Sequence, residues 1–555
     1  MKDKRLLIAD IFYIPISLLF LYLMFKNYPQ FLDISMVDET GYMELLNFNP
    51  LIYPGGYGPL YIISYKILYQ FIPDFVHLHY FAIITLTWLP AVALFYFLRS
   101  RKVAYGLALY ASWALLCTSY IAAFDWWART AHYSIFFIFL FLIFTANYKK
   151  QIVKLLVFAT LFAKILAYVR PELNVTSYML FGFLVLYVGY VRFYQKQKLN
   201  IYFSGFEKIS VVVLLIVYLG MFLIWKSPTT NTGRMYFALG QHYTFNTILW
   251  NHQERKEFLH WEETFKAKFG ESKTFADMYK NNPEETIKHV TFNIQHYFQQ
   301  TLDFIPELFL PKVVFKNINS SIKCFFILLL CGLCIFRIGW QNYWNHLKET
   351  ISINFVPLFI AFAFAVPSAL ASFVIYPREH YFIMQLVFLI YLIYVLLTPI
   401  IRSYQPQIKY KFVSVIFLVT CLIFITPNVK SYTRYNNFYT YEKPNYLPYI
   451  QTIREMKIDS VVNFLSFEIL PVYLGKNFRG HAFFSKQPFY DSIIVAKDIN
   501  MIYMSDVIEK DKRNQADSSF SYFMYNYKNL GWQKLQLKDK WGYLIYKKDL
   551  VENGK

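Results

Sequence analysis

Residues 208–225 read KISVVVLLIVYLGMFLIW. The stretch is apolar almost throughout and has about the length, roughly 20 residues, that a helix needs to cross the hydrocarbon core of a bilayer. Similar runs recur along the chain, and together the predicted spans cover residues 5–26, 80–98, 103–123, 133–147, 151–169, 173–191, 208–225, 323–339, 352–375, 382–400 and 410–427. The pattern predicts a polytopic α-helical membrane protein with about eleven transmembrane helices.

The composition agrees with a chain that lies in lipid. Apolar residues make up 56% of the 555 residues and charged residues only 16%, well below the roughly 25% of a soluble domain. The net charge of +20 does not indicate nucleic acid, because no soluble segment carries a basic stripe with interleaved aromatic residues. The five cysteines fall in apolar runs, which favours packing over zinc or redox chemistry. We expect a membrane environment and no nucleic-acid partner.

Lys and Arg gather in every second connection between the predicted spans. These basic connections lie near the N-terminus and at residues 99–102, 149–154, 192–198, 337–348 and 402–411. Because such cations concentrate on the cytoplasmic side, the pattern predicts an N-terminus inside and a C-terminus outside.

Three longer pieces are then expected on the exoplasmic face. Loops at 27–79 and 226–322 belong to a transmembrane domain at 1–429, and residues 430–555 form a small α/β domain. In the second loop, Pro283-Glu284-Glu285 opens an amphipathic run to Gln299 that reads as a helix. In the tail we expect strands at 460–465 and 541–546 and a short helix at 467–474.

Ionisable residues collect at the predicted outer ends of the spans. They are Asp33, Asp38, Glu39, Glu44, Arg129, His132, Arg170, Glu172, Arg378, Glu379 and His380. At a membrane boundary such groups pair, face water or perform a function. A carboxylate can take a proton from an attacking hydroxyl while Arg and His hold a departing phosphate. Two plainer explanations stay open: Asp38 could cap a short helix that follows Ser35, and Arg129 and Arg170 could be interfacial anchors.

Three short motifs follow one another on this side. They are Val37-Asp38-Glu39-Thr40-Gly41-Tyr42, the Pro/Gly-rich element Tyr53-Pro54-Gly55-Gly56-Tyr57-Gly58-Pro59-Leu60-Tyr61, and Pro377-Arg378-Glu379-His380-Tyr381. Their order, with a soluble domain behind the last span, resembles the GT-C superfamily of polytopic glycosyltransferases, particularly the bacterial members similar to protein O-mannosyltransferases and the lipid A aminoarabinose transferase. The resemblance covers roughly the first 400 residues in architecture, and each motif alone is short.

The resemblance implies roles for the residues that match. Asp38 takes the place of the catalytic base and Glu39 that of its partner, whereas Arg378 takes the place of an arginine that contacts the lipid phosphate. In the family a tyrosine follows this arginine directly. Here Glu379 and His380 intervene, which leaves the role of His380 beside the phosphate open.

We add Arg170 as a second cation for the phosphate. The remaining candidates for substrate binding are Tyr57, Glu172, His242 and His289. Two adjacent acids offer too few oxygens to require Mg²⁺. The sequence therefore identifies no cofactor with certainty, and binding of a divalent cation stays open.

The expected activity is inverting transfer of a sugar from a polyprenyl-phosphate-type lipid to a glycan, lipid or protein acceptor outside a bacterial cytoplasmic membrane. An O-antigen-ligase-like or polymerase-like enzyme would instead depend on the loop at 226–322 with His242 and His289. A lipid or solute transporter would carry polar residues at mid-membrane. The predicted spans are nearly free of charge at that depth, with Lys164 as the main exception, which argues against a transporter.

Overall fold

The computed structural model describes most of the chain. The described residues are 10–32, 58–118, 121, 129–148, 151–196, 203–228, 232–252, 258, 260–312, 314–315, 317–404, 411–428, 446–466, 470–475, 477–482, 488–510, 512–537 and 542–552.

Six helices in these residues are long and apolar enough to cross a membrane. They are α5 (Phe75–Ser100), α10 (Leu173–Gly189) with the π-helical segment η4 (Tyr190–Tyr194) that continues it, α11 (Gly205–Trp225), α16 (Ser320–Ile338), α17 (Trp340–Val374) and α18 (Glu379–Tyr404). Each coincides with a span expected from the sequence. The six helices indicate a multi-pass membrane protein.

The other expected spans also contain apolar helices, but with shorter described lengths. They are α2 (Tyr13–Phe25), α6 (Tyr105–Leu116), α8 (Thr130–Thr145), α9 (Ile152–Leu166) and α19 (Lys411–Ile425). The longest of these helices, α8, has 16 residues, fewer than the roughly 20 that a perpendicular crossing needs. A total of about eleven crossings therefore stays a prediction.

Burial separates central helices from peripheral ones. In the most apolar 18-residue stretch of α5, 67% is buried inside the protein, whereas the corresponding share is 6% in α11 and in α16. The peripheral helices expose large apolar side chains, among them Leu223 at 80% and Phe336 at 86%. Exposing apolar surface to water costs about 25 cal/mol per Å², so these faces require lipid or another apolar partner.

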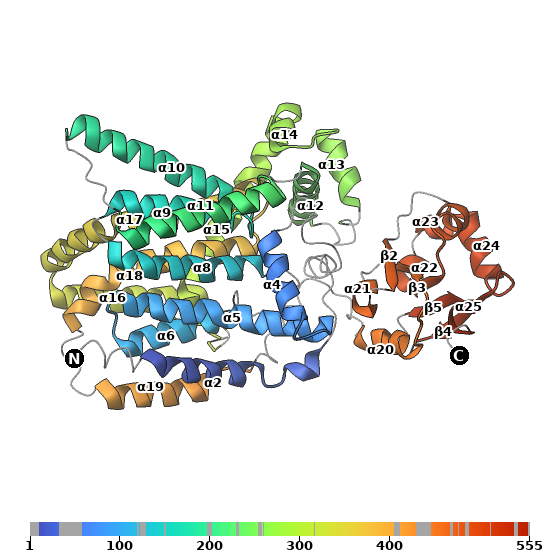
Figure 1. Ribbon diagram of the computed structural model, residues 1–555, viewed down its shortest axis with the longest axis horizontal. Coiled ribbons are helices and arrows are strands. Elements are labelled where there is room, and N and C mark those ends of the chain that lie inside the picture. The colour runs from blue at the N-terminus through green and yellow to red at the C-terminus, as the bar shows by residue number, and fades with distance from the viewer. Residues whose placement is uncertain are drawn as a thin grey trace.

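Figure 1 shows what lies at one end of this bundle. The helices α4 (Pro59–Tyr69), α12 (Thr232–Trp250), α13 (Trp261–Phe269) and α14 (Phe275–Asn281) gather there, on the side of the C-terminal domain. We call this end, where α17 finishes and α18 begins, the loop end. The first half of the expected outer loop, from α12 to α14, and the C-terminal domain thus lie at the same end of the bundle (Figure 1).

The helix α15 (Pro283–Glu307) confirms the expected helix start and runs farther than expected. Asn282 caps it by accepting from the backbone N–H of Glu285 at 3.2 Å. The helix then enters the bundle: Tyr297 hydrogen-bonds Gln385 of α18, and beyond its end the carbonyl of Phe309 accepts from Tyr110 in the middle of α6. The second half of the expected outer loop is therefore packed among the bundle helices.

One expected connection is largely helical. The sequence predicts a basic connection at 337–348, whereas α17 already starts at Trp340. Gly339 separates it from α16 with a φ of +86°, a conformation that glycine adopts without steric cost. The two cations of this segment are thus divided, with Arg337 in the last turn of α16 and Lys348 in α17.

The C-terminal domain contains a mixed five-stranded sheet in the order β2-β1-β3-β5-β4. The strands are β1 (Val462–Ser466), β2 (Phe478–Ala482), β3 (Met501–Ser505), β4 (Trp532–Gln536) and β5 (Gly542–Lys547). β1 pairs in parallel with β2 and β3, and β5 pairs antiparallel with β3 and β4. The strands expected at 460–465 and 541–546 are confirmed as β1 and β5.

Short helices surround this sheet. They are α20 (Leu447–Glu455), α21 (Pro471–Leu474), η9 (Phe489–Val495), α22 (Asp506–Glu509), α23 (Lys512–Gln515), α24 (Ser518–Asn526) and α25 (Asp549–Glu552). Ile502 and Ile545 from the central strands pack with Phe523 of α24 in one buried cluster. The described part of the expected helix at 467–474 contains α21.

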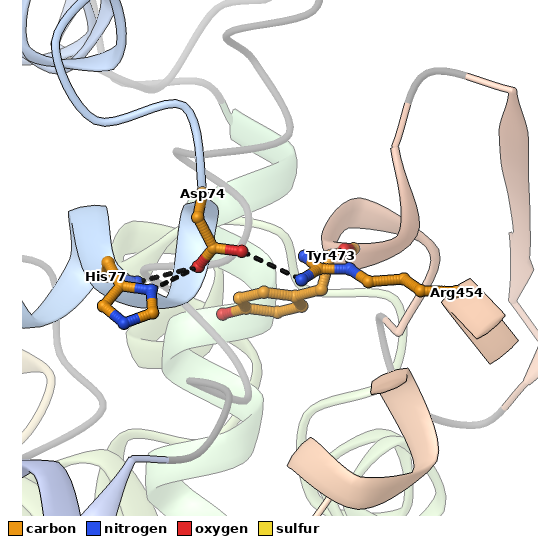
Figure 2. Close-up of polar contacts among 4 residues, drawn as sticks. All are labelled: Asp74, His77, Arg454 and Tyr473. Atoms are coloured by element: carbon orange, nitrogen blue, oxygen red, sulfur yellow. Dashed lines mark hydrogen bonds and ion pairs between the residues drawn. The ribbon is translucent and has the colours of Figure 1, made fainter. Parts of the chain in front are cut away.

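Figure 2 shows a polar contact that joins the bundle to this domain. Asp74 caps α5 by accepting from the backbone N–H of His77 at 3.0 Å, and its other oxygen accepts from Arg454 of α20 at 2.9 Å. Arg454 also donates to the carbonyl of Tyr473 at 2.7 Å. Burial raises the pKa of Asp74, but the hydrogen bonds from His77 and Arg454 outweigh it and hold this pKa below 3.8.

Replacing Asp74 with alanine should lower the thermal unfolding midpoint of the protein in detergent. Loss of the helix cap costs about 1 kcal/mol, and the partly exposed pair with Arg454 adds at most about 1 kcal/mol. Asp74→Asn keeps a cap acceptor and should recover most of the loss. Because the folded-state pKa is depressed, the contribution of the carboxylate is present above pH 3.8 and is lost as the pH falls further. An unchanged midpoint in the alanine variant would contradict the role of the cap.

Candidate functional site

Arg170 lies in the turn between α9 and α10 at the loop end. Its backbone N–H closes the last turn of α9 on Leu166 at 3.0 Å, and the following Pro171 disfavours further helix at Arg170. The side chain Nε donates to Glu172 Oε1 at 2.6 Å. The guanidinium also lies over the ring of Tyr381, with its carbon 5.9 Å from the ring centroid. Arg170 is thus placed against the first turn of α18.

Among the described residues, one guanidinium nitrogen of Arg170 has no hydrogen-bond acceptor. The residue is 5% exposed, and Nη1 is buried with no hydrogen bond. A buried donor without an acceptor costs about 1–3 kcal/mol. An anionic ligand that reached this nitrogen would remove that cost.

The Pro/Gly-rich motif ends directly beside Arg170. A Cβ on Gly58 would lie 2.0 Å from the carbonyl oxygen of Val169, so only glycine fits there. The backbone N–H of Leu60 then donates to the carbonyl of Tyr168 at 3.1 Å. Gly58 therefore places the start of α4 against the turn that carries Arg170.

Arg378 lies in the short segment between α17 and α18. Its Nη2 donates to Nε2 of His242 on α12. The ring of His242 stacks on Tyr376, with centroids 5.3 Å apart and an interplanar angle of 15°. Tyr381, which touches Arg170, closes its first helical hydrogen bond on the carbonyl of Arg378 at 3.0 Å. Residues from three distant segments, the turn at Arg170, α12 and residues 376–381, therefore meet around the start of α18.

His296 of α15 extends this group on the far side of Tyr376. Its Nε2 accepts from Gln300 at 2.8 Å, and the hydroxyl of Tyr376 lies 3.4 Å from the same nitrogen. Burial lowers the pKa of His296. Burial also raises the pKa of Tyr376 to about 12, although the charge of Arg378 opposes this. Both rings are therefore neutral near pH 7.

His289 is fully buried and has a structural position. Its Nδ1 accepts from the Asn246 amide at 2.8 Å, and its Nε2–H donates to the carbonyl of Val374 at 3.2 Å. Asn293, which accepts from Asn246 at 2.8 Å, donates to the carbonyl of Phe373 at 3.0 Å. Burial lowers the pKa of His289 to about 4. The cluster holds the last turn of α17, and both nitrogens of the His289 ring are in use.

Replacing His289 with alanine should lower the thermal unfolding midpoint of the protein. The variant that remains folded should still bind the expected lipid-phosphate ligand. The Asn246 amide and the Val374 carbonyl would lose a partner, at about 1–3 kcal/mol for each buried group. His260, whose side chain is 47% exposed, provides the matched control, and His260→Ala should change neither quantity. A normal midpoint together with lost sugar transfer would assign His289 to catalysis instead.

Arg129 is a second buried cation at the loop end. It is 1% exposed, donates to the carbonyl of Ile121 at 3.0 Å and contacts His132 at 2.6 Å. Its backbone N–H donates to the Tyr61 hydroxyl of α4 at 3.1 Å. These contacts anchor the start of α8, and the interfacial-anchor interpretation does not fit a side chain this deeply buried.

The other residues expected at the site cannot be placed. Asp38, Glu39 and Tyr57 lie outside the described residues. For His380 the structure describes the backbone, in the first turn of α18, but not the side chain. The described site therefore comprises Arg170, Glu172, His242 and Arg378 with Tyr376, Tyr381 and His296, and the proposed base is not part of it.

Within the described residues, no three His, Cys, Asp or Glu side chains come together to hold a metal ion. The described donors are guanidinium, imidazole and phenol groups, with Glu172 paired to Arg170. Such an arrangement fits an anionic group better than a cation.

No family model matches the chain, and no curated protein matches it. The resemblance to the GT-C superfamily therefore rests on the motifs and their order in the sequence alone.

Sequence reasoning missed Tyr376, Asn246 and His296. Tyr376 immediately precedes the Pro377-Arg378 motif, so its position was a usable signal. His296 and Asn246 carry no local pattern, because their partners lie 80 and 43 residues away.

Proposed function

We propose that the protein is an inverting glycosyltransferase that moves a sugar from a polyprenyl-phosphate-type lipid to an acceptor. The observation that carries the proposal is Arg170: a buried guanidinium with one nitrogen that has no acceptor among the described residues, beside the turn that contains Arg378. A lipid phosphate at a membrane boundary needs several donors to replace its hydration, and Arg is the side chain best suited to supply them. The N-terminus of α18 adds a favourable field for an anion.

In this mechanism Asp38 removes the proton from the acceptor hydroxyl as its oxygen bonds to the anomeric carbon. The bond from that carbon to the phosphate oxygen breaks, and the polyprenyl phosphate leaves with the electron pair. Arg170 and Arg378 stabilise the charge that develops on the phosphate, so no general acid is required. Attack opposite the leaving group inverts the anomeric configuration.

The proposal places the loop end and the C-terminal domain on the exoplasmic side of a bacterial cytoplasmic membrane. The basic connections support this orientation. The acceptor, whether glycan, lipid or protein, would approach from the same side.

The O-antigen-ligase-like alternative depends on His242 and His289. Both nitrogens of His289 are occupied by Asn246 and Val374, and its pKa near 4 leaves it a weak base. His242 faces the guanidinium of Arg378. These contacts favour supporting roles for both histidines.

Membranes that contain the protein should transfer label from polyprenyl-phosphate sugars, and Arg378 variants test the phosphate site. Arg378→Ala should weaken donor binding by about tenfold or more, the worth of one charge-assisted hydrogen bond. Arg378→Lys should lose less, because it keeps the charge without the forked geometry. Unchanged donor affinity in both variants would make Arg378 an interfacial anchor and move the phosphate site elsewhere.

A further inference from the structure

The last turn of α9 carries a charged residue inside one of the expected spans. Lys164 Nζ donates to Oδ1 of Asn174 at 2.6 Å, and it lies 4.0 Å from the centroid of the Tyr178 ring. A lysine near the end of a span lays its stem along the helix so that its ammonium reaches the membrane boundary. Asn174 is the second residue of α10, so this ammonium lies at the level of the first turn of α10, near the loop end.

The ammonium of Lys164 pairs with no carboxylate in the part of the chain that the structure describes. Its contacts there are an amide oxygen and an aromatic ring. The other lysine of the same helix, Lys154, forms an ion pair with Glu207 at 2.8 Å. Because an unpaired charge at a membrane boundary is costly, the position of Lys164 favours a counter-ion that comes from outside the chain.

The groups around this ammonium are hydrogen-bond donors. A lysine ammonium has three protons and no acceptor, and Asn174 Oδ1 accepts only one of them. The other half of the same amide, Nδ2, makes no hydrogen bond within the described residues. One charged and one neutral donor therefore lie side by side, an arrangement that fits an anionic oxygen.

The same side of α10 is turned toward lipid. Thr176 donates to a backbone carbonyl of α17 at 2.9 Å, and Asn174 and Tyr178 each lie two residues away, or about 200° around the helix. Tyr178 is 60% exposed, and Val175 and Phe181 beside it are 43% and 56% exposed. Figure 1 shows α10 at the edge of the bundle. A ligand at this place meets a cation at one end and an apolar helix face along its length.

We propose that Lys164, Asn174 and Tyr178 bind the phosphate of an anionic phospholipid in the leaflet at the loop end. The acyl chains lie along the exposed apolar face of α10, and the head group neutralises Lys164. A zwitterionic lipid fits less well, because its own ammonium competes with Lys164 for the phosphate. The site is separate from Arg170, whose guanidinium lies over Tyr381 of α18, and the inference does not depend on the proposed glycosyl transfer.

The test is binding of phosphatidylglycerol to the full-length protein in detergent. Native mass spectrometry measures the affinity for the most tightly bound lipid, and the thermal unfolding midpoint is measured on the same preparations. Lys164→Met keeps an unbranched stem without the charge and should bind about tenfold more weakly, as for loss of one charge-assisted hydrogen bond. Lys164→Arg keeps the charge and should keep most of the affinity.

A second variant supplies the counter-ion from within the protein. Asn174→Asp places a carboxylate of the same size beside Lys164. The lipid phosphate should then be displaced, so we expect affinity to fall by about tenfold although Lys164 is still present. The thermal midpoint should be equal to or above that of the wild type. A purely structural role of Lys164 predicts no loss of lipid in this variant.

Lys288→Met is the matched control. Lys288 is also an ammonium over an aromatic ring, 4.4 Å from the centroid of Trp250, but Glu285 lies 4.0 Å from its Nζ. This variant should bind phosphatidylglycerol as the wild type does. An equal loss in Lys288→Met and Lys164→Met would show a general effect of net charge and overturn the site.

Other results would also contradict the proposal. They are equal affinity of the wild type and Lys164→Met, retained affinity in Asn174→Asp, and equally tight binding of phosphatidylcholine. Displacement of the lipid by an equal concentration of inorganic phosphate would identify a site for free anions instead. The effect of Lys164→Met should persist in an Arg378→Ala background, and its disappearance there would place the lipid at the proposed donor site. Failure of this inference can thus be told apart from failure of the proposed function.

Discussion

Replacing Asp38 with asparagine should lower the rate of sugar transfer by about 10²-fold or more, the usual contribution of acid–base catalysis. Asparagine keeps the size of the side chain and most of its capping ability, so the protein should insert and bind the donor normally. The measurement is single-turnover transfer from a labelled polyprenyl-phosphate sugar. Binding of farnesyl methyl phosphate, a phosphate diester like the sugar donor, is measured on the same preparation. Asp33→Asn, in the same loop but outside the motif, is the matched control.

Two other results would reassign Asp38. If it only caps a helix, the asparagine variant loses at most about 1 kcal/mol of local stability and keeps its activity. The ligase-like alternative predicts the reverse pattern, with Asp38→Asn tolerated and His289→Ala inactive while folded. Full activity of Asp38→Asn would remove the main support for a base at this position.

The second large effect is expected at Arg170. Arg170→Ala removes a phosphate donor and also leaves the carboxylate of Glu172, whose side chain is 25% exposed, without its counter-ion beside the phosphate. Truncating one member of a buried charge pair costs about 2–5 kcal/mol. We therefore expect the affinity of the protein for farnesyl methyl phosphate to fall by about 10²-fold or more.

The double variant Arg170→Ala/Glu172→Gln tests the cause of this loss. Neutralising Glu172 removes the repulsion but not the missing donor, so binding should recover by about tenfold and stay below that of the wild type. Glu172→Gln alone should leave binding equal to or tighter than wild type, because it frees Arg170 for the phosphate. No difference between Arg170→Ala and the double variant would show that Glu172 does not face the ligand.

The helical part of the fold could be predicted because long apolar runs leave few alternatives in lipid. The strands β1 and β5 were predicted from their apolar residues, but β2, β3 and β4 were not. Of these, β2 and β4 lie at the edges of the sheet, where polar side chains such as Arg479 and Lys534 are exposed to solvent and mask the strand pattern. The strand β3 is central and fully buried, so edge position does not explain its omission; an apolar run of five residues is too short to be told from a helix segment by periodicity.

The candidate site was predictable in its cations and not in its contacts. Arg170 and Arg378 stood out because charge at a membrane boundary is costly. The carbonyl contacts of His289 and the pairing of Arg378 with His242 depend on how α12 and α15 pack, and no local pattern encodes that packing. The junction of Asp74 with Arg454 spans 380 residues and was likewise invisible to sequence reasoning.

The path of α15 has a consequence for biogenesis. The helix is too polar to partition into lipid by itself, and its deep contact joins Tyr297 to Gln385, which the ribosome reaches 88 residues later. At about 5–20 residues per second, this delay lasts on the order of 4 to 18 s. During that time α15 must wait in the aqueous phase or at the bilayer surface. The contact between Tyr297 and Gln385 can therefore form only after this part of α18 has been made, and a nascent chain that stops before α18 lacks it.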